Sequence, residues 1–213
     1  MNKQTLRTAV AVAIGGLAMA AQADTVNLSS FTYSAQSVSV SAPNYSGSAG
    51  QFSGTLNSVS FVTFCTDLYQ TFNWNTDYSY SVVSGVSAWG AAKSTSMDHL
   101  LSYLSAGSLP NDGVSSAVAQ AAIWEVIYET GSGYGFGAGS FTATAGGAVQ
   151  TALNAFDWTA AMAAPITLHV DKLYSESHQD FLVTTAVPEP GTYALMLAGL
   201  GAVGFVARRR RAA

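Results

Sequence analysis

The first third of the chain alternates apolar and polar side chains with the period of two that is typical of β-strands. Val38-Ser39-Val40-Ser41, Val59-Ser60-Phe61 and Tyr78-Ser79-Tyr80-Ser81-Val82 follow this pattern. Between these runs lie residues that mark turns, namely Gly47, Gly50, Gly54 and Asn57. We therefore expect β-structure from residue 24 to about residue 87.

The apolar spacing then changes to that of a helix. Ser96 is the expected N-cap of a helix that carries Leu100, Leu101 and Leu104 on one face and ends near Gly107.

A second helix is predicted from Ser115 or Ser116 to about residue 130, and a weaker third helix over residues 147–156. Residues 166–170 and 181–185 have the composition of closing strands. The expected fold class is α+β: a β-sheet or barrel-like domain with a helical insertion.

The second helix places an amide in its apolar face. At about 100° per residue, Ile123, Trp124 and Ile127 lie within about 60° of Gln120. A buried primary amide left without hydrogen bonds costs about 1–3 kcal/mol, so this side chain is expected to have a partner. The opposite side carries two acidic residues, expected as a solvated pair: Glu125 and Glu129.

Charge is scarce and unevenly placed. Only 9% of the 213 residues are charged, against roughly 25% in ordinary soluble proteins. Residues 24–189 contain two basic and twelve acidic residues, a formal charge of −10. This balance argues against nucleic-acid binding, which needs a basic surface, and against a cytosolic housekeeping enzyme.

The N-terminus is typical of a secretory signal peptide. Lys3 and Arg7 precede an uncharged apolar run over residues 8–20, and Ala21-Gln22-Ala23 supplies the small residues that signal peptidase accepts. The alternative, a membrane anchor, is disfavoured because the run is too short to span a bilayer comfortably. We expect residues 1–23 to be removed on export.

The C-terminus, residues 187–213, has the composition of a stop-transfer tail. Pro188-Glu189-Pro190 precedes an uncharged stretch over residues 193–207, which is expected to form a single transmembrane helix. Arg208-Arg209-Arg210-Arg211 follows and should stay cytoplasmic by the positive-inside rule. The domain between the two ends, residues 24–186, is thereby expected outside the inner membrane.

Pro-Glu-Pro, an apolar helix and an arginine cluster together resemble the PEP-CTERM sorting signal of Gram-negative bacteria. In that family the membrane protease-transpeptidase exosortase is thought to recognise and remove the tail. The resemblance implies exosortase as a processing partner, transient anchoring in the inner membrane, and delivery to the cell surface or extracellular matrix of a bacterium that makes exopolysaccharide, biofilm or floc. The resemblance concerns the destination of the protein and not its activity. The alternative to a sorting signal is a plain membrane anchor.

Cys65 is the only thiol of an exported chain, and it ends the apolar run Phe61-Val62-Thr63-Phe64-Cys65. An odd cysteine in an oxidising compartment is masked, buried, paired between chains or used chemically. Burial is the commonest fate of a free cysteine.

Two segments together resemble the thioester domain of Gram-positive surface adhesins. They are Phe64-Cys65-Thr66-Asp67-Leu68 and, 55 positions later, Gln120-Ala121-Ala122-Ile123-Trp124. In that family a strand cysteine and a helix glutamine condense to an internal thioester. The resemblance implies that Cys65 gives the sulfur and Gln120 the acyl group, although Ala119 stands where the family has threonine. Phe64, Ile123 and Trp124 are expected to form an apolar pocket that excludes water.

The expected function is that of an adhesin or matrix cross-linker and not that of a turnover enzyme. The protein would capture amines or hydroxyls of an exopolysaccharide or cell-surface target and would need no cofactor. The alternative is a non-covalent polysaccharide-binding or structural matrix protein with a buried free Cys65. Residues 69–78 mix aromatic and polar side chains, and Tyr69, Trp74 and Tyr78 are candidates for stacking on a sugar. The alternative, an aromatic strand with a polar turn that belongs to the core, is favoured because most aromatic side chains serve in packing.

Other chemistries find little support. A cysteine–histidine hydrolase would need one of the three histidines beside Cys65, and no spacing favours any of them. The cluster His169, Asp171, Glu176 and His178 fits no standard zinc pattern, so no metal is expected. The glycine-rich loop over residues 131–137 lacks the lysine and the strand–loop–helix setting of a phosphate-binding loop.

Overall fold

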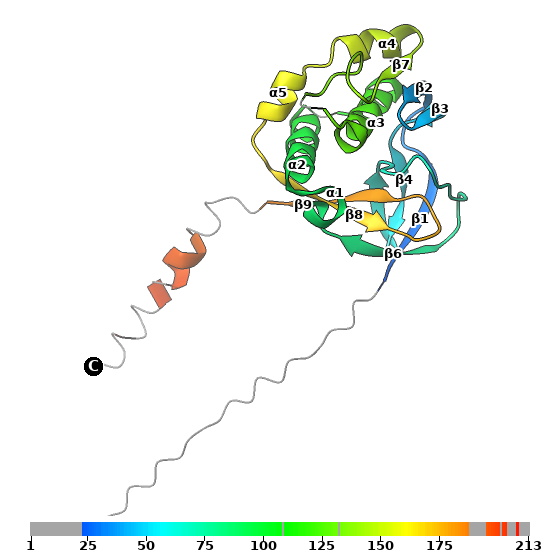
Figure 1. The fold of residues 1–213 in the computed structure, drawn as a ribbon. Coiled ribbons are helices and arrows are strands. Elements are labelled where there is room, and N and C mark those ends of the chain that lie inside the picture. Colours follow the sequence, from blue (N-terminus) through cyan, green and yellow to red (C-terminus); the bar gives the residue numbers. More distant parts are fainter. Residues whose placement is uncertain are drawn as a thin grey trace, which may run out of the picture.

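The computed structural model describes residues 23–107, 109–131, 133–187, 195–200, 202–203 and 208 (Figure 1). The signal peptide expected over residues 1–23 lies almost entirely outside this range, as do Pro188, Glu189, Pro190, Arg209, Arg210 and Arg211. The described part combines antiparallel sheets with a helical insertion, as the α+β prediction requires.

Nine strands form two sheets in the part of the chain that the structure describes. The strands are β1 (Asp24–Phe31), β2 (Gln36–Ser41), β3 (Asn44–Ala49), β4 (Phe52–Leu56), β5 (Val59–Thr63), β6 (Tyr78–Val83), β7 (Ala143–Ala145), β8 (Leu168–Tyr174) and β9 (Phe181–Ala186). The larger sheet has the order β5-β4-β1-β6-β8-β9, and the smaller one the order β3-β2-β7.

The larger sheet nearly closes into a barrel, because the chain that leaves β5 pairs with β9. Leu182 donates its N–H to the Phe64 carbonyl (3.1 Å), and Thr66 donates to the Asp180 carbonyl (2.9 Å). Between these two bonds Cys65 forms a bridge with Phe181. Cys65 therefore lies in the seam where the first and last parts of the domain meet.

The helical insertion separates β6 from β8 and lies to one side of the larger sheet (Figure 1). Its helices are α1 (Gly85–Trp89), α2 (Ala91–Ala106), α3 (Gly113–Tyr128), α4 (Gly147–Asn154) and α5 (Trp158–Ala163). The expected β-structure up to residue 87 ends earlier, because Ser84 caps α1. α2 begins five residues before Ser96, and α5 and β7 were not predicted.

Helix α3 begins slightly before the predicted cap. Asp112 accepts the Ser115 N–H (2.7 Å), and the two residues form a capping box, so the helix starts at Gly113. α3 packs against α2, α4, β2 and β3, and every residue from Ser116 to Val126 is buried. The helix is thus enclosed on all sides.

The enclosure of α3 corrects one prediction. Glu125 and Glu129 are buried and do not form a solvated pair. The side of α3 that carries these acidic residues is covered and does not face water, because small residues such as Ala117, Ala121 and Ala122 let neighbouring elements approach the helix from every direction.

The expected transmembrane helix over residues 193–207 falls partly outside the described residues. Leu195–Leu200 and residues 202–203 are helical. Among the residues that the structure describes, no helix is long and apolar enough to cross a membrane.

Candidate functional site

Cys65 and Gln120 are in direct contact. The Cys65 N–H donates to Gln120 Oε1 (2.9 Å), and Gln120 Nε2 donates to the Cys65 carbonyl (2.8 Å). Both residues are 1% exposed. The side-chain amide thus satisfies both backbone polar groups of Cys65, as a neighbouring strand would. The prediction that the buried Gln120 amide has a partner is confirmed.

The sulfur of Cys65 has two polar neighbours. Its S–H donates to the Asp67 carbonyl (2.7 Å), and Gln179 Nε2 donates to Sγ (2.8 Å). Gln179 Nε2 also donates to the Asp67 carbonyl (3.0 Å). Burial raises the pKa of the Cys65 thiol to about 12, so the sulfur is protonated at neutral pH.

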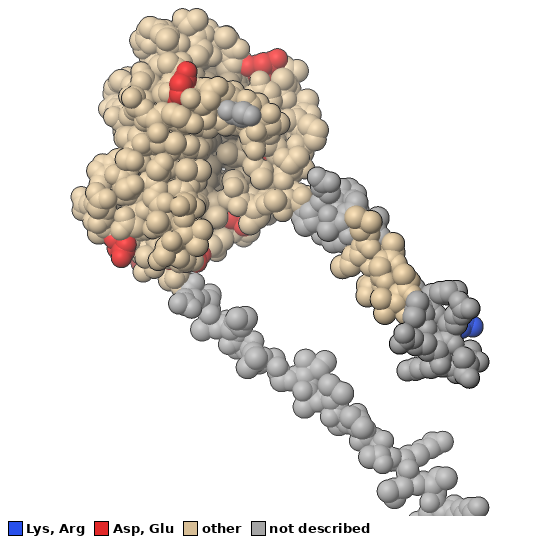
Figure 2. Space-filling model, turned by 180° about the vertical axis from the view of Figure 1, so that it is seen from behind, with Lys and Arg blue, Asp and Glu red and all other residues tan. Residues whose placement is uncertain are grey.

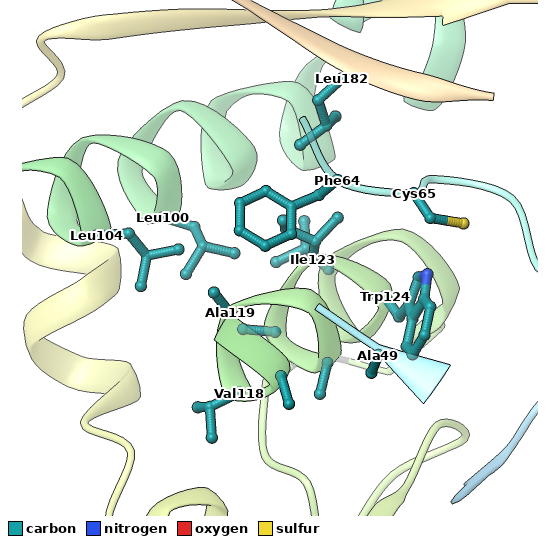
Figure 3. Close-up of a cluster of buried hydrophobic side chains, with 14 of the residues drawn as sticks. Ala49, Phe64, Cys65, Leu100, Leu104, Val118, Ala119, Ile123, Trp124 and Leu182 are labelled. Carbon is teal, nitrogen blue, oxygen red and sulfur yellow. The ribbon is translucent and has the colours of Figure 1, made fainter. Parts of the chain in front are cut away.

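Trp124 places an indole N–H next to this thiol. The side chain is 2% exposed, and its Nε1 forms no hydrogen bond of full geometry within the described part of the chain, but it lies close enough to the Cys65 sulfur to lower the pKa of the thiol against the larger effect of burial. In Figure 3 the indole nitrogen lies on the side of the ring that faces Cys65. A buried N–H without a partner is costly, which makes it available to a ligand or to charge that develops on the sulfur or its acyl partner.

The three residues expected to line the pocket do not all do so. Phe64 and Ile123 point into the hydrophobic core, where Phe64 faces Leu100 and Leu104 of α2 (Figure 3). Phe64 lines a different cavity of about 180 Å³. Consecutive residues of an extended chain point to opposite sides, so Phe64 and Cys65 cannot share one pocket wall. Of the three, Trp124 alone lies beside the thiol.

A cavity of about 350 Å³ leads to the Cys65–Gln120 pair. We call it the thiol cavity. All its lining residues are uncharged, and they are mostly aromatic or bear amide and hydroxyl groups. They are Phe31, Tyr45, Ser48, Phe52, Cys65, Leu68, Tyr69, Gln70, Thr71, Phe72, Trp74, Gln120, Trp124 and Gln179.

The aromatic segment predicted to stack on sugars is split by the fold. Tyr69 and Trp74 line the thiol cavity, with 74% and 39% of their surfaces exposed. Tyr78 does not line it: its ring packs on His178 at a centroid distance of 4.0 Å, and its hydroxyl accepts the Asn73 N–H (3.2 Å). Tyr78 therefore has a structural role in holding the loop.

Two residues of the site were missed in the sequence. Gln179 lies 114 positions from Cys65 and meets it only because β9 closes the barrel. Tyr128, two turns after Gln120 on α3, accepts the Leu68 N–H (3.1 Å) and donates to the Thr66 carbonyl (3.3 Å). No motif or spacing marks either residue.

The two buried glutamates of α3 hold the glycine-rich loop instead of facing water. Glu129 accepts hydrogen bonds from the Gly131 N–H, the Phe141 N–H and the Ser140 hydroxyl, which lower the pKa of its carboxyl. Glu125 accepts the Gly135 N–H (2.7 Å), and burial raises the pKa of its carboxyl to about 7.

Hydrolase and metal chemistry find no site in the described residues. His99 contacts the Ala164 carbonyl, His169 pairs with Asp98 (2.9 Å), and His178 lies beside Ser177. None of these histidines is among the hydrogen-bond partners of Cys65. Within the ranges that the structure describes, no group of three His, Cys, Asp or Glu side chains could hold a metal ion.

Comparison with known families matches residues 186–211 to the PEP-CTERM protein-sorting motif. Comparison with the curated proteins and with the solved structures finds no significant match. The chain therefore carries a C-terminal sorting signal, which indicates an exported surface protein that exosortase processes. The match covers the tail alone and leaves the activity of residues 24–186 open.

Proposed function

We propose that residues 24–186 form a single-use covalent adhesin or matrix cross-linker of a cell surface, biofilm or exopolysaccharide. In this proposal Cys65 and Gln120 condense to an internal thioester, which later captures an amine or hydroxyl of the target. The observation that carries the proposal is the pair of hydrogen bonds between the Gln120 amide and the Cys65 peptide groups. They hold the acyl group next to the only thiol of the chain.

The condensation needs no external reagent. The Cys65 sulfur attacks Cδ of Gln120, the C–N bond breaks, the thiol proton goes to the leaving nitrogen, and ammonia departs. The Cys65 N–H already donates to Gln120 Oε1, where negative charge develops in the tetrahedral intermediate. The Trp124 indole N–H offers a further donor on the same side of the sulfur.

The raised pKa of the thiol means that the sulfur starts the reaction protonated. Its proton must therefore pass to the departing nitrogen as the sulfur bonds to carbon, because little thiolate is present. Burial also keeps bulk water from the product, which would otherwise hydrolyse.

The test is the intact mass of the exported protein together with a thiol titration after denaturation. We expect a mass short by one ammonia and no free thiol. Methylamine should then add one amine and release one thiol. The variants Cys65→Ser and Gln120→Met should show the full calculated mass and no methylamine adduct. A wild-type protein with full mass and one titratable thiol would contradict the proposal.

A second function is favoured by the exposed aromatic rings of the thiol cavity. Tyr69 and Trp74 present flat surfaces beside amide groups, which suits a non-covalent polysaccharide-binding protein with a buried free Cys65. Such binding would be indifferent to methylamine and would survive in Cys65→Ser.

A further inference from the structure

The thiol cavity is the route by which a target group can reach the Gln120 carbonyl, because both Cys65 and Gln120 are buried and line it. Its aromatic wall is held rigidly. Trp74 packs against Phe31, Phe52 and Phe72 with ring centroids 5.4, 5.7 and 4.7 Å away, yet 39% of Trp74 stays exposed. A fixed, partly exposed indole is suited to stacking on a sugar ring.

Two buried polar atoms of the cavity lining indicate the polarity of the occupant. Gln70 Oε1 is a buried acceptor without a partner among the described residues. Trp124 Nε1 is a buried donor whose nearest polar neighbour is the Cys65 sulfur, a weak acceptor. Gln70 Nε2 donates to the Glu176 carbonyl (3.0 Å), which fixes the amide and leaves Oε1 to accept a bond. A donor and an acceptor in one cavity match hydroxyl groups, which both donate and accept.

Because the cavity lining carries no charge, it favours an amine in its neutral form over a charged ammonium group. No lining residue is charged, so an ammonium group that entered would lose its hydration without gaining a carboxylate. The nearest carboxylate is that of Asp67, which acts on the Cys65 thiol through its charge but does not line the cavity and accepts the Tyr69 N–H (2.8 Å). A lysine amine, with a pKa near 10.4, is almost fully charged at neutral pH. The amine of a 2-amino sugar is less basic and is neutral in a larger fraction of molecules.

The outer surface of the domain is acidic, unlike the cavity lining. Four of the acidic residues are buried, namely Asp98, Glu125, Glu129 and Asp180. Those that the structure leaves exposed or half-buried are Asp24, Asp67, Asp77, Asp112, Asp157, Asp171 and Glu176, against two half-buried lysines, Lys93 and Lys172. Figure 2 shows one face of the domain with scattered acidic side chains and no lysine or arginine. A polysaccharide with free amines is a polycation in water, so the acidic surface attracts the chain over a distance. The uncharged cavity then accepts one amine in its neutral form.

We infer that the thiol cavity receives a 2-amino-2-deoxy sugar of a polysaccharide with free amines, with its ring against Trp74 and Tyr69. This inference rests on the proposed thioester. The neutral amine attacks Cδ of Gln120, a C–N bond forms, the C–S bond breaks, and the proton of the attacking nitrogen goes to the Cys65 sulfur. The products are an amide on Gln120 and a free thiol.

The test compares amines of similar basicity with and without a sugar ring. The exported protein is treated with D-glucosamine, glycinamide, N-acetylglucosamine or methylamine, and adducts are followed by intact mass and thiol release. We expect glucosamine to react roughly tenfold faster than glycinamide. Tyr69→Ala and Trp74→Ala should reduce that ratio toward one. Tyr174→Ala, an exposed aromatic of β8 that does not line the cavity, should leave it unchanged.

The outcomes separate the two proposals. Methylamine adducts with equal glucosamine and glycinamide rates would overturn the sugar inference and keep the thioester. A failure of every amine to form an adduct would overturn the proposed function itself. An ester with N-acetylglucosamine at a rate comparable to that of glucosamine would show a hydroxyl target and overturn the choice of an amine. A ratio that Tyr69→Ala and Trp74→Ala both leave unchanged would overturn the role of the aromatic wall.

Discussion

The side-chain amide of Gln120 hydrogen-bonds both backbone polar groups of Cys65, at 2.9 and 2.8 Å, from 55 positions away. A helix side chain thereby continues the barrel seam at a point where no strand covers Cys65 on that side. The same two bonds that stabilise the seam also hold the carboxamide against the backbone of the residue that bears the thiol. Structure and proposed chemistry therefore depend on one contact.

Removal of the Gln120 amide should destabilise the domain even without a thioester. In a Cys65→Ala background, Gln120→Met leaves the N–H and C=O of residue 65 buried and unpaired, at a cost of about 2–5 kcal/mol. Urea unfolding measures this difference. Thr159→Ala, an exposed change on α5, should stay within about 0.5 kcal/mol. A Gln120→Met variant as stable as its parent would show that water replaces the amide.

The thiol of Cys65 should be unreactive in the folded state. In Gln120→Met, which cannot form the thioester, the pKa of about 12 leaves little thiolate at pH 8. Alkylation by iodoacetamide, followed by mass, should be at least roughly a hundredfold slower than in urea. Equal rates in the folded and unfolded protein would mean that the fold does not raise the pKa of the thiol.

Glu125 should make the domain less stable as the pH rises. The pKa of its carboxyl is about 7 when folded and near 4.5 when unfolded, so the folded state holds the proton more tightly. Its contribution is complete below pH 4.5 and is lost between about pH 4.5 and pH 7. Glu125→Gln should therefore raise Tm relative to wild type more at pH 8 than at pH 5, by calorimetry.

The control for that prediction is Thr159→Ala, an exposed change on α5 that removes no titratable group, for which the difference in Tm should be the same at both pH values. A Glu125→Gln variant that is less stable than wild type at pH 8 would indicate that the charged carboxylate is needed for the bond to Gly135.

Glu129 should anchor the glycine-rich loop. Its contribution to the stability of the domain should depend on pH in the opposite sense to that of Glu125. Its folded pKa is lowered by the bonds from Gly131, Ser140 and Phe141, so its contribution is present above about pH 4.5 and is lost as the pH falls below that value. Glu129→Ala should increase proteolytic cleavage within residues 131–141 at pH 7. Gly139→Ala should do the same, because φ is +107° and a Cβ would lie 2.1 Å from Glu129 Oε2.

The sorting signal should be needed for processing and not for folding. In a host with exosortase, replacement of Pro188, Glu189 and Pro190 by alanine should leave the tail attached, seen as a larger mass in the membrane fraction. The control Thr159→Ala should be processed normally. Normal processing of the triple variant would show that the apolar stretch and arginine cluster suffice.

Local patterns were enough for several features of this protein. Alternation over residues 38–41 and 59–61 identified strands, and the C-terminal pattern identified the sorting tail of an exported protein. The signal peptide over residues 1–23 stays a prediction. The position of Gln120 among Ile123, Trp124 and Ile127 correctly predicted a buried amide with a partner. Each of these depends on residues close in sequence, where period and composition carry the information.

Tertiary structure decided the remainder. Gln179 meets the Cys65 sulfur only because the barrel closes, and the wall of the thiol cavity comes from strands, a loop and α3 together. Glu125 and Glu129 were misplaced because the enclosure of α3 depends on elements far away in sequence. Contacts of this kind are set by which surfaces pack together, and a single stretch of sequence determines its own periodicity but not what covers it.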